Sequence, residues 1–99
     1  MFEMFKESGF NGDLSGWDVS RVRNMNGMFY YSKFKGNHGD IGKWDVSNVT
    51  NMDYMFAQCP FVGDLSQWNL RSLNSNNHMV SYDMVDYVKL PHGVRIQRR

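Results

Sequence analysis

The sequence predicts an α/β fold, a β/α solenoid of about three units that each contribute a short parallel strand and a short helix. Two observations carry this prediction. A block of the chain recurs with a period of about 24 residues, and the apolar residues in each block follow first a strand spacing and then a helix spacing. Self-similarity at a period of roughly 20–50 residues is the signature of repeat architectures.

The recurring block is clearest around the three tryptophans. Residues 10–20 (FNGDLSGWDVS) recur as residues 61–71 (FVGDLSQWNLR), and residues 34–47 repeat the pattern with the insertion Asn37–Gly39. This insertion explains why the tryptophans are 27 and then 24 residues apart. The second half of the unit, VRNMNGMF at residues 22–29, recurs as VTNMDYMF.

The repeat divides the chain into two regions. Residues 1–76 form the predicted solenoid, with a half unit at residues 1–9 and units that begin at about residues 10, 34 and 61. Residues 77–99 are predicted to form a C-terminal cap, for which a β-hairpin around residues 91–93 is one arrangement, and a basic tail. Because the chain begins in mid-unit, either further repeats precede it or the half unit is itself an N-terminal cap.

The first half of each unit has the spacing of a half-buried strand. Leu14, Trp17 and Val19 match the L-x-x-L-x-L pattern of leucine-rich repeats. Alternation along a strand places Trp17 and Val19 in the core and Asp18 in solvent. The same spacing recurs at Ile41, Trp44 and Val46 and at Leu65, Trp68 and Leu70.

The second half of the unit has the spacing of a short helix. Met25, Met28 and Phe29 stand at i, i+3 and i+4, which is one helical face. Asn24 and Asn51 precede two such faces and are N-cap candidates. The methionines are interpreted as flexible core residues, and metal binding by them is a weaker alternative.

Composition and charge exclude several classes of protein. The chain has 99 residues, a net charge of +1 and 41% hydrophobic residues, so it is predicted to be one globular domain without a general affinity for nucleic acid. No apolar run reaches the length of about 20 residues that a membrane span requires. Residues 1–10 show no signal peptide.

No arrangement of reactive side chains predicts catalysis. His38, His78 and His92 share no spacing with one another or with Cys59, the single cysteine. We therefore predict no catalytic residue, no metal site and no cofactor, and the protein is not expected to be an enzyme. A column of Asp18, Asp45 and Asn69 is interpreted as solvated, with binding of a cation or a basic partner as the alternative. Tyr30, Tyr31 and Tyr54 are either interface anchors or packing between units.

Two blocks of the sequence resemble a known family. Residues 12–20 (GDLSGWDVS) and 44–56 (WDVSNVTNMDYMF) are similar to the BspA-like class of leucine-rich repeats, a bacterial surface-protein repeat, and the resemblance covers about residues 1–80. It implies a leucine-rich-repeat fold, protein binding, adhesion and a cell-surface location. Similar repeats in phages and large DNA viruses leave a virion protein as the alternative.

The predicted function is therefore non-catalytic protein binding through the exposed strand face. The alternative is a small structural component of a virion or other assembly, in which the solenoid ends and the tail residues Arg95, Arg98 and Arg99 contact neighbouring subunits. The residues predicted to bind a protein are Ser15, Gly16, Asp18, Ser20, Arg21, Lys43, Asp45, Ser47, Asn48, Gln67, Asn69 and Arg71.

Overall fold

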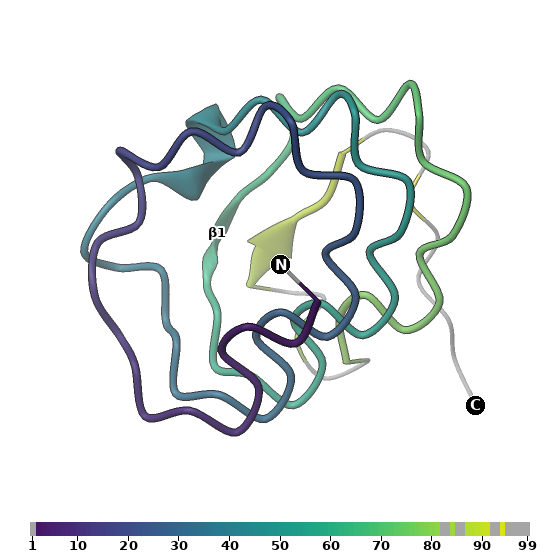
Figure 1. Ribbon diagram of the computed structural model, residues 1–99. Coiled ribbons are helices and arrows are strands. Elements are labelled where there is room, and N and C mark those ends of the chain that lie inside the picture. The colour runs from purple at the N-terminus through teal and green to yellow at the C-terminus, as the bar shows by residue number, and fades with distance from the viewer. Residues whose placement is uncertain (1, 82–83, 85–86, 92–93, 95–99) are drawn as a thin grey trace.

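A computed structural model describes residues 2–81, 84, 87–91 and 94. Its regular elements are few and short: the 3-10 helix η1 (Ile41–Lys43) and the strands β1 (Gly63–Asp64) and β2 (Val88–Lys89). β1 and β2 form a two-stranded parallel sheet in which Gly63 lies opposite Val88. The remaining described chain consists of turns and extended segments that wind around one core (Figure 1).

The predicted β/α solenoid is wrong. The described residues form a small compact body that has no α-helix, and no strand–helix unit repeats along them. What survives of the sequence repeat is a set of backbone contacts between equivalent segments. Single parallel bridges join Asn24 to Asn51 and Asn51 to Ser75.

The segments predicted as helices are instead the Met–Phe segments, defined here as residues 2–8, 24–32, 51–58 and 75–80. Along them the amide N–H groups alternate between two kinds of acceptor. Met28 donates within its own turn to Met25, whereas Phe29 donates to Met55 of the next segment at 2.9 Å. An α-helix would direct both amides to carbonyls four residues earlier in the same segment. Pairing between segments therefore replaces the helix.

Left-handed backbone conformations recur in these segments and also exclude a helix. Tyr31 and Tyr54 both have φ near 57°, and Gly27 has φ of 62°. Such residues turn the chain at regular intervals, so that Met25, Met28 and Phe29 are fully buried without being helical. The i, i+3, i+4 spacing correctly identified an inward-facing set of side chains, but a series of turns produces the same spacing.

The tryptophan-containing segments are likewise turns rather than the predicted strands. Trp44 and Trp68 are buried, and their indole N–H groups donate to the carbonyls of Leu14 and Ile41 at 2.9 and 3.0 Å. Trp17 is 38% exposed. The inward position predicted for Trp17 is therefore only half achieved, because the ring of Phe5, 5.8 Å away between centroids, covers it only in part.

Aromatic side chains from equivalent positions pack against one another through the core. The ring centroid of Phe29 lies 5.6 Å from that of Phe5 and 5.4 Å from that of Phe56, and the ring planes are nearly parallel. A second row runs from Phe10 through Phe34 to Phe61. Burial of Phe29, Phe34, Phe56 and Phe61 in these rows stabilises the fold, because aromatic side chains remove a large apolar area from water.

In the C-terminal region, the first strand of the predicted hairpin coincides with β2. β2 pairs in parallel with β1, which precedes it by more than twenty residues, a pairing that the sequence did not predict. Residues 92–93 of the predicted turn and residues 95–96 of the predicted second strand lie outside the described residues. The same holds for the tail residues Arg95, Arg98 and Arg99.

Candidate protein-binding surface

The predicted binding residues are positioned by a local turn that recurs along the chain. In each Asp-X-Ser triplet the carboxylate accepts two hydrogen bonds from the serine two residues later. Asp18 Oδ1 accepts from the Ser20 amide at 3.0 Å and from its hydroxyl at 2.6 Å, and Asp45 accepts from Ser47 at the same distances. Asp and Ser favour such turns because their short side chains mimic backbone groups.

The third copy preserves the turn with an amide in place of the carboxylate. Asn69 Oδ1 accepts the backbone N–H of Arg71 at 3.0 Å. Three equivalent turns therefore carry Asp18, Asp45 and Asn69, and all three side chains are exposed. We call the surface formed by these turns and their predicted neighbours the turn surface.

The charges of the turn surface lie close enough to interact. The Ser47 hydroxyl, followed by its amide, lowers the pKa of Asp45, and Arg71 lowers it further. Slight desolvation and the neighbouring Asp18 carboxylate raise the pKa of Asp45, but by less. The pKa of Asp18 is lowered mainly by Ser20, with a smaller contribution from Arg21. Two carboxylates and two guanidinium groups thus share this surface, with both signs interspersed.

Most of the predicted residues are accessible. Ser15 and Ser20 are half-buried and Ser47 is buried, because their hydroxyls are directed to the turn carboxylates. The side-chain amide of Asn48 donates to the backbone carbonyl of Ser20 at 2.7 Å and so connects two of the turns. The exposed members are Gly16, Asp18, Arg21, Lys43, Asp45, Asn48, Gln67, Asn69 and Arg71.

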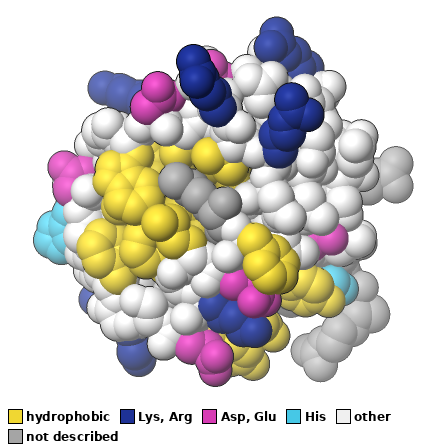
Figure 2. Space-filling model, in the orientation of Figure 1, with side chains coloured by type: hydrophobic (Ala, Val, Ile, Leu, Met, Phe, Trp, Pro, Cys, Tyr) yellow, Lys and Arg dark blue, Asp and Glu magenta, His cyan; other side chains and the backbone are white. Residues whose placement is uncertain are grey.

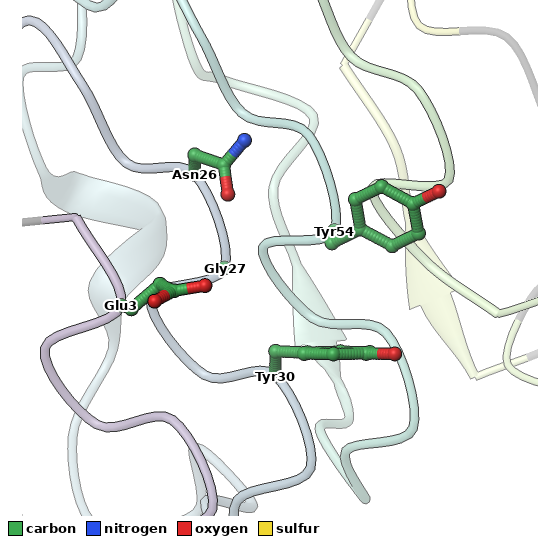
Figure 3. A pocket seen from close by; sticks show the side chains of 5 residues that line it. All are labelled: Glu3, Asn26, Gly27, Tyr30 and Tyr54. Carbon is green, nitrogen blue, oxygen red and sulfur yellow. The ribbon is translucent and has the colours of Figure 1, made fainter.

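A small pocket that the sequence did not predict lies between the Met–Phe segments. It has a volume of about 170 Å³ and is lined by Glu3, Asn26, Gly27, Tyr30 and Tyr54. Figure 3 shows the Glu3 carboxylate and the two tyrosine rings bordering one space. The tyrosines were recognised as candidate interface residues, but no sequence signal connects Glu3 to them.

Hydrophobic side chains are exposed where the N-terminal segment lies. Phe2 and Met4 are 58% and 52% exposed, and the half-buried rings of Phe5 and Phe10 stack beside the partly exposed Trp17. Figure 2 shows hydrophobic side chains gathered on the face toward the viewer, bordered by charged ones. At this end the aromatic rows of the core reach the surface.

The reactive side chains of the described region do not form a metal or nucleophile site. No group of three His, Cys, Asp or Glu residues that could hold a metal ion occurs within it. Cys59 is buried, its thiol donates to the Phe34 carbonyl at 2.9 Å, and burial raises the pKa of the thiol. A thiol in this state is a weak nucleophile. Residues 2–81, 84, 87–91 and 94 also include no helix that could cross a membrane.

The chain, whose described residues form turns without an α-helix, belongs to a family that is defined by sequence and whose function is not known. A family model described as "Mycoplasma protein of unknown function, DUF285" matches residues 1–86, and the chain belongs to this family. DUF285 is a different family from the BspA-like leucine-rich repeats, so that predicted membership was wrong. No curated protein matches the chain. No solved structure matches it either.

Proposed function

We propose that the protein is a non-catalytic protein-binding module and that the turn surface contacts its partner. The observation that carries this proposal is the recurrence of one exposed polar turn, at Asp18, Asp45 and Asn69, with Arg21 and Arg71 beside it. The turns hold these side chains in defined positions, so little conformational entropy remains to be lost on binding. The interspersed charges favour a partner with a complementary pattern.

A charge-removal experiment tests the role of the turn surface. Protein captured on the immobilised chain is purified, and its affinity is measured for the wild type and for the double variant Asp18→Asn/Asp45→Asn. Asn69 demonstrates that an amide oxygen supports the same turn, so the variant loses two charges and retains its fold. We expect the affinity to fall by about tenfold.

The matched control is the double variant Asp13→Asn/Asp64→Asn. Asp13 and Asp64 accept the same pair of hydrogen bonds, from Ser15 and Ser66, but neither carboxylate is part of the proposed contact. Equal losses of affinity in the two double variants, or no loss in either, would show that binding does not use the turn surface.

The second candidate function is a structural component of a larger assembly. The exposed apolar side chains at the N-terminal end, Phe2, Met4 and Trp17, favour it. Size-exclusion chromatography with light scattering separates the two functions. A protein that remains monomeric at high concentration supports the recognition module, and concentration-dependent association that Trp17→Ser abolishes supports the assembly component.

A further inference from the structure

We infer that the pocket between the Met–Phe segments is a binding site for an alkylammonium cation. It is formed by Glu3, Asn26, Gly27, Tyr30 and Tyr54 and lies outside the turn surface. The inference rests on the chemistry of the lining, on the size of the pocket and on the position of a lysine of the chain itself.

The lining combines an acidic group with aromatic faces. The rings of Tyr30 and Tyr54 have centroids 5.6 Å apart and planes inclined at 58°, so they form an open corner (Figure 3). The Glu3 carboxylate borders the same space. Aromatic faces attract cations through their quadrupole, and a carboxylate adds a full negative charge. This combination selects a cation with an apolar surface.

The backbone is arranged so that Glu3 can border the pocket. Gly27 has φ of 62°, and a Cβ atom added there would lie only 3.2 Å from Glu3 Cγ. A larger residue at position 27 would therefore push the Glu3 side chain away. The Glu3 amide also donates to the Asn26 carbonyl at 2.9 Å, which anchors this part of the lining.

The chain's own ammonium group shows which charge this site attracts. Lys6 Nζ lies 3.3 Å from Glu3 Oε2 and 5.8 Å from the centroid of the Tyr30 ring. Both members of this ion pair are about one-third exposed, and exposed pairs of this kind are weak. An external cation can therefore displace Lys6 from Glu3 at little cost.

The volume limits the ligand to a small group. The pocket volume of about 170 Å³ is smaller than the roughly 300–1,000 Å³ of pockets that hold drug-sized ligands. A lysine side chain of a protein or a quaternary ammonium head group fits this limit, and both present the same chemistry.

A titration followed by NMR tests the site. The ¹⁵N-labelled chain is titrated with choline and, separately, with its neutral isostere 3,3-dimethyl-1-butanol at constant ionic strength. We expect saturable shifts at the amides of Asn26 and Gly27 with choline, and roughly fivefold weaker binding of the alcohol. N-acetyl-lysine methylamide and its trimethylated form then show whether a primary or a quaternary ammonium binds more tightly.

Three variants test which side chains contribute to choline binding. Glu3→Gln and Tyr54→Leu should each weaken choline binding by roughly fivefold, and Lys6→Gln should strengthen it because a competing ammonium is removed. The matched control is Glu7→Gln. Glu7 is an exposed glutamate with the same left-handed backbone as Glu3 (φ 57° and 51°), and it does not line the pocket.

The proposal fails under any of three results. The neutral isostere binds as tightly as choline, Glu7→Gln weakens binding as much as Glu3→Gln, or no saturable shift appears up to about 100 mM choline. Wild-type shift dispersion in the spectra of the variants separates a lost contact from a lost fold.

Discussion

At the scale of single residues, the aspartates of this protein act first as turn formers. Asp13, Asp18, Asp45 and Asp64 each hold a serine two residues later, and Asp40 holds the Gly42 amide. Because the acceptor oxygen Oδ1 is occupied by the turn, a partner of the turn surface would contact the outer oxygen Oδ2. The carboxylates can thus serve folding and recognition together.

The lowered pKa values of these carboxylates predict acid sensitivity. Hydrogen bonds from the serines lower the pKa of all four from the ordinary value of 3.8. A carboxylate whose pKa is lower in the folded state contributes stability above its unfolded pKa and loses it as pH falls through the folded pKa. We expect the urea midpoint to fall as pH drops below about 4, with a shallower fall in Asp18→Asn/Asp45→Asn. An unchanged slope in that variant would contradict the assignment.

A second prediction concerns Asn76, which stands in the repeat where Met25 and Met52 are fully buried. Its buried Nδ2 finds no hydrogen-bond partner among the described residues. An unsatisfied buried amide costs about 1–3 kcal/mol, so Asn76→Met should stabilise the protein by roughly 1 kcal/mol. Urea denaturation measures this, and Asn77→Met at the exposed neighbouring position serves as control. Destabilisation by Asn76→Met would imply that the amide is needed.

At the scale of elements, the units of this protein are turns joined by hydrogen bonds to the next segment. The backbone amides of Phe5, Phe29 and Phe56 donate to the carbonyls of Met28, Met55 and Met79, respectively, at 2.8–2.9 Å. In residues 2–8, 24–32 and 51–58, amides that donate within the turn alternate with amides that donate to the next segment. Such elements are held by their neighbours, because an isolated turn buries neither its amides nor its apolar side chains.

The tryptophans should differ in importance although they share one motif. Trp44→Ala removes a buried ring and its hydrogen bond to Leu14, and we expect a loss of about 3–5 kcal/mol. Trp17→Ala removes a ring that is 38% exposed and should cost less than about 2 kcal/mol. Chemical denaturation of both variants measures the difference. Equal losses would mean that Trp17 is covered in solution.

Two glycines at neighbouring positions of the repeat, one and two residues before a tryptophan, should also differ. A Cβ atom at Gly42, within η1, would collide with the backbone carbonyl of Asp64 in β1, whereas nothing lies within 4 Å of a Cβ atom at Gly16. Gly42→Ala should therefore destabilise the protein by about 1–3 kcal/mol, and Gly16→Ala by no more than about 0.5 kcal/mol. Thermal unfolding of the two variants compares them. A neutral Gly42→Ala would show that η1 and β1 can separate.

At the scale of the whole molecule, the hydrogen bonds between segments have a direction. Within the Met–Phe segments, amides of an earlier segment donate to carbonyls of the next one, from Glu3 to Asn26 and from Gly27 to Asp53. Residues that border these segments donate in the reverse direction, as from Lys33 to Ser8 and from Thr50 to Arg23. Among the described residues, the first Met–Phe segment has backbone hydrogen bonds to other segments only with residues 26–33. The same end of the molecule exposes Phe2 and Met4. Interior segments are covered on both sides.

This asymmetry predicts the pattern of amide hydrogen exchange. Amides of Phe29 and Met52, which donate between interior segments, should exchange most slowly, and those of Phe5 and Glu7 in the first segment should exchange faster. NMR-detected exchange at neutral pH measures the difference. Uniform protection factors along the chain would show that the first segment unfolds only together with the rest.

Part of this arrangement could be predicted from the sequence. The period, the insertion at Asn37–Gly39 and the burial of Met25, Met28 and Val46 follow from side-chain chemistry, which the alignment of the chain with itself reveals. The exposure of Asp18 and Asp45 follows from the same pattern. The turn surface was therefore identified by its residues, although as a strand face.

The sequence by itself determined which residues are equivalent and which of them are apolar. Only the tertiary structure decided the backbone. A spacing of i, i+3, i+4 fits both a helix and a series of turns, and the amides of Phe29 and Phe56 selected the turns by pairing with the next segment. The tertiary structure also placed Glu3 beside Tyr30 and Tyr54. Contacts between distant segments depend on how the turns pack, so they leave no local pattern in the sequence.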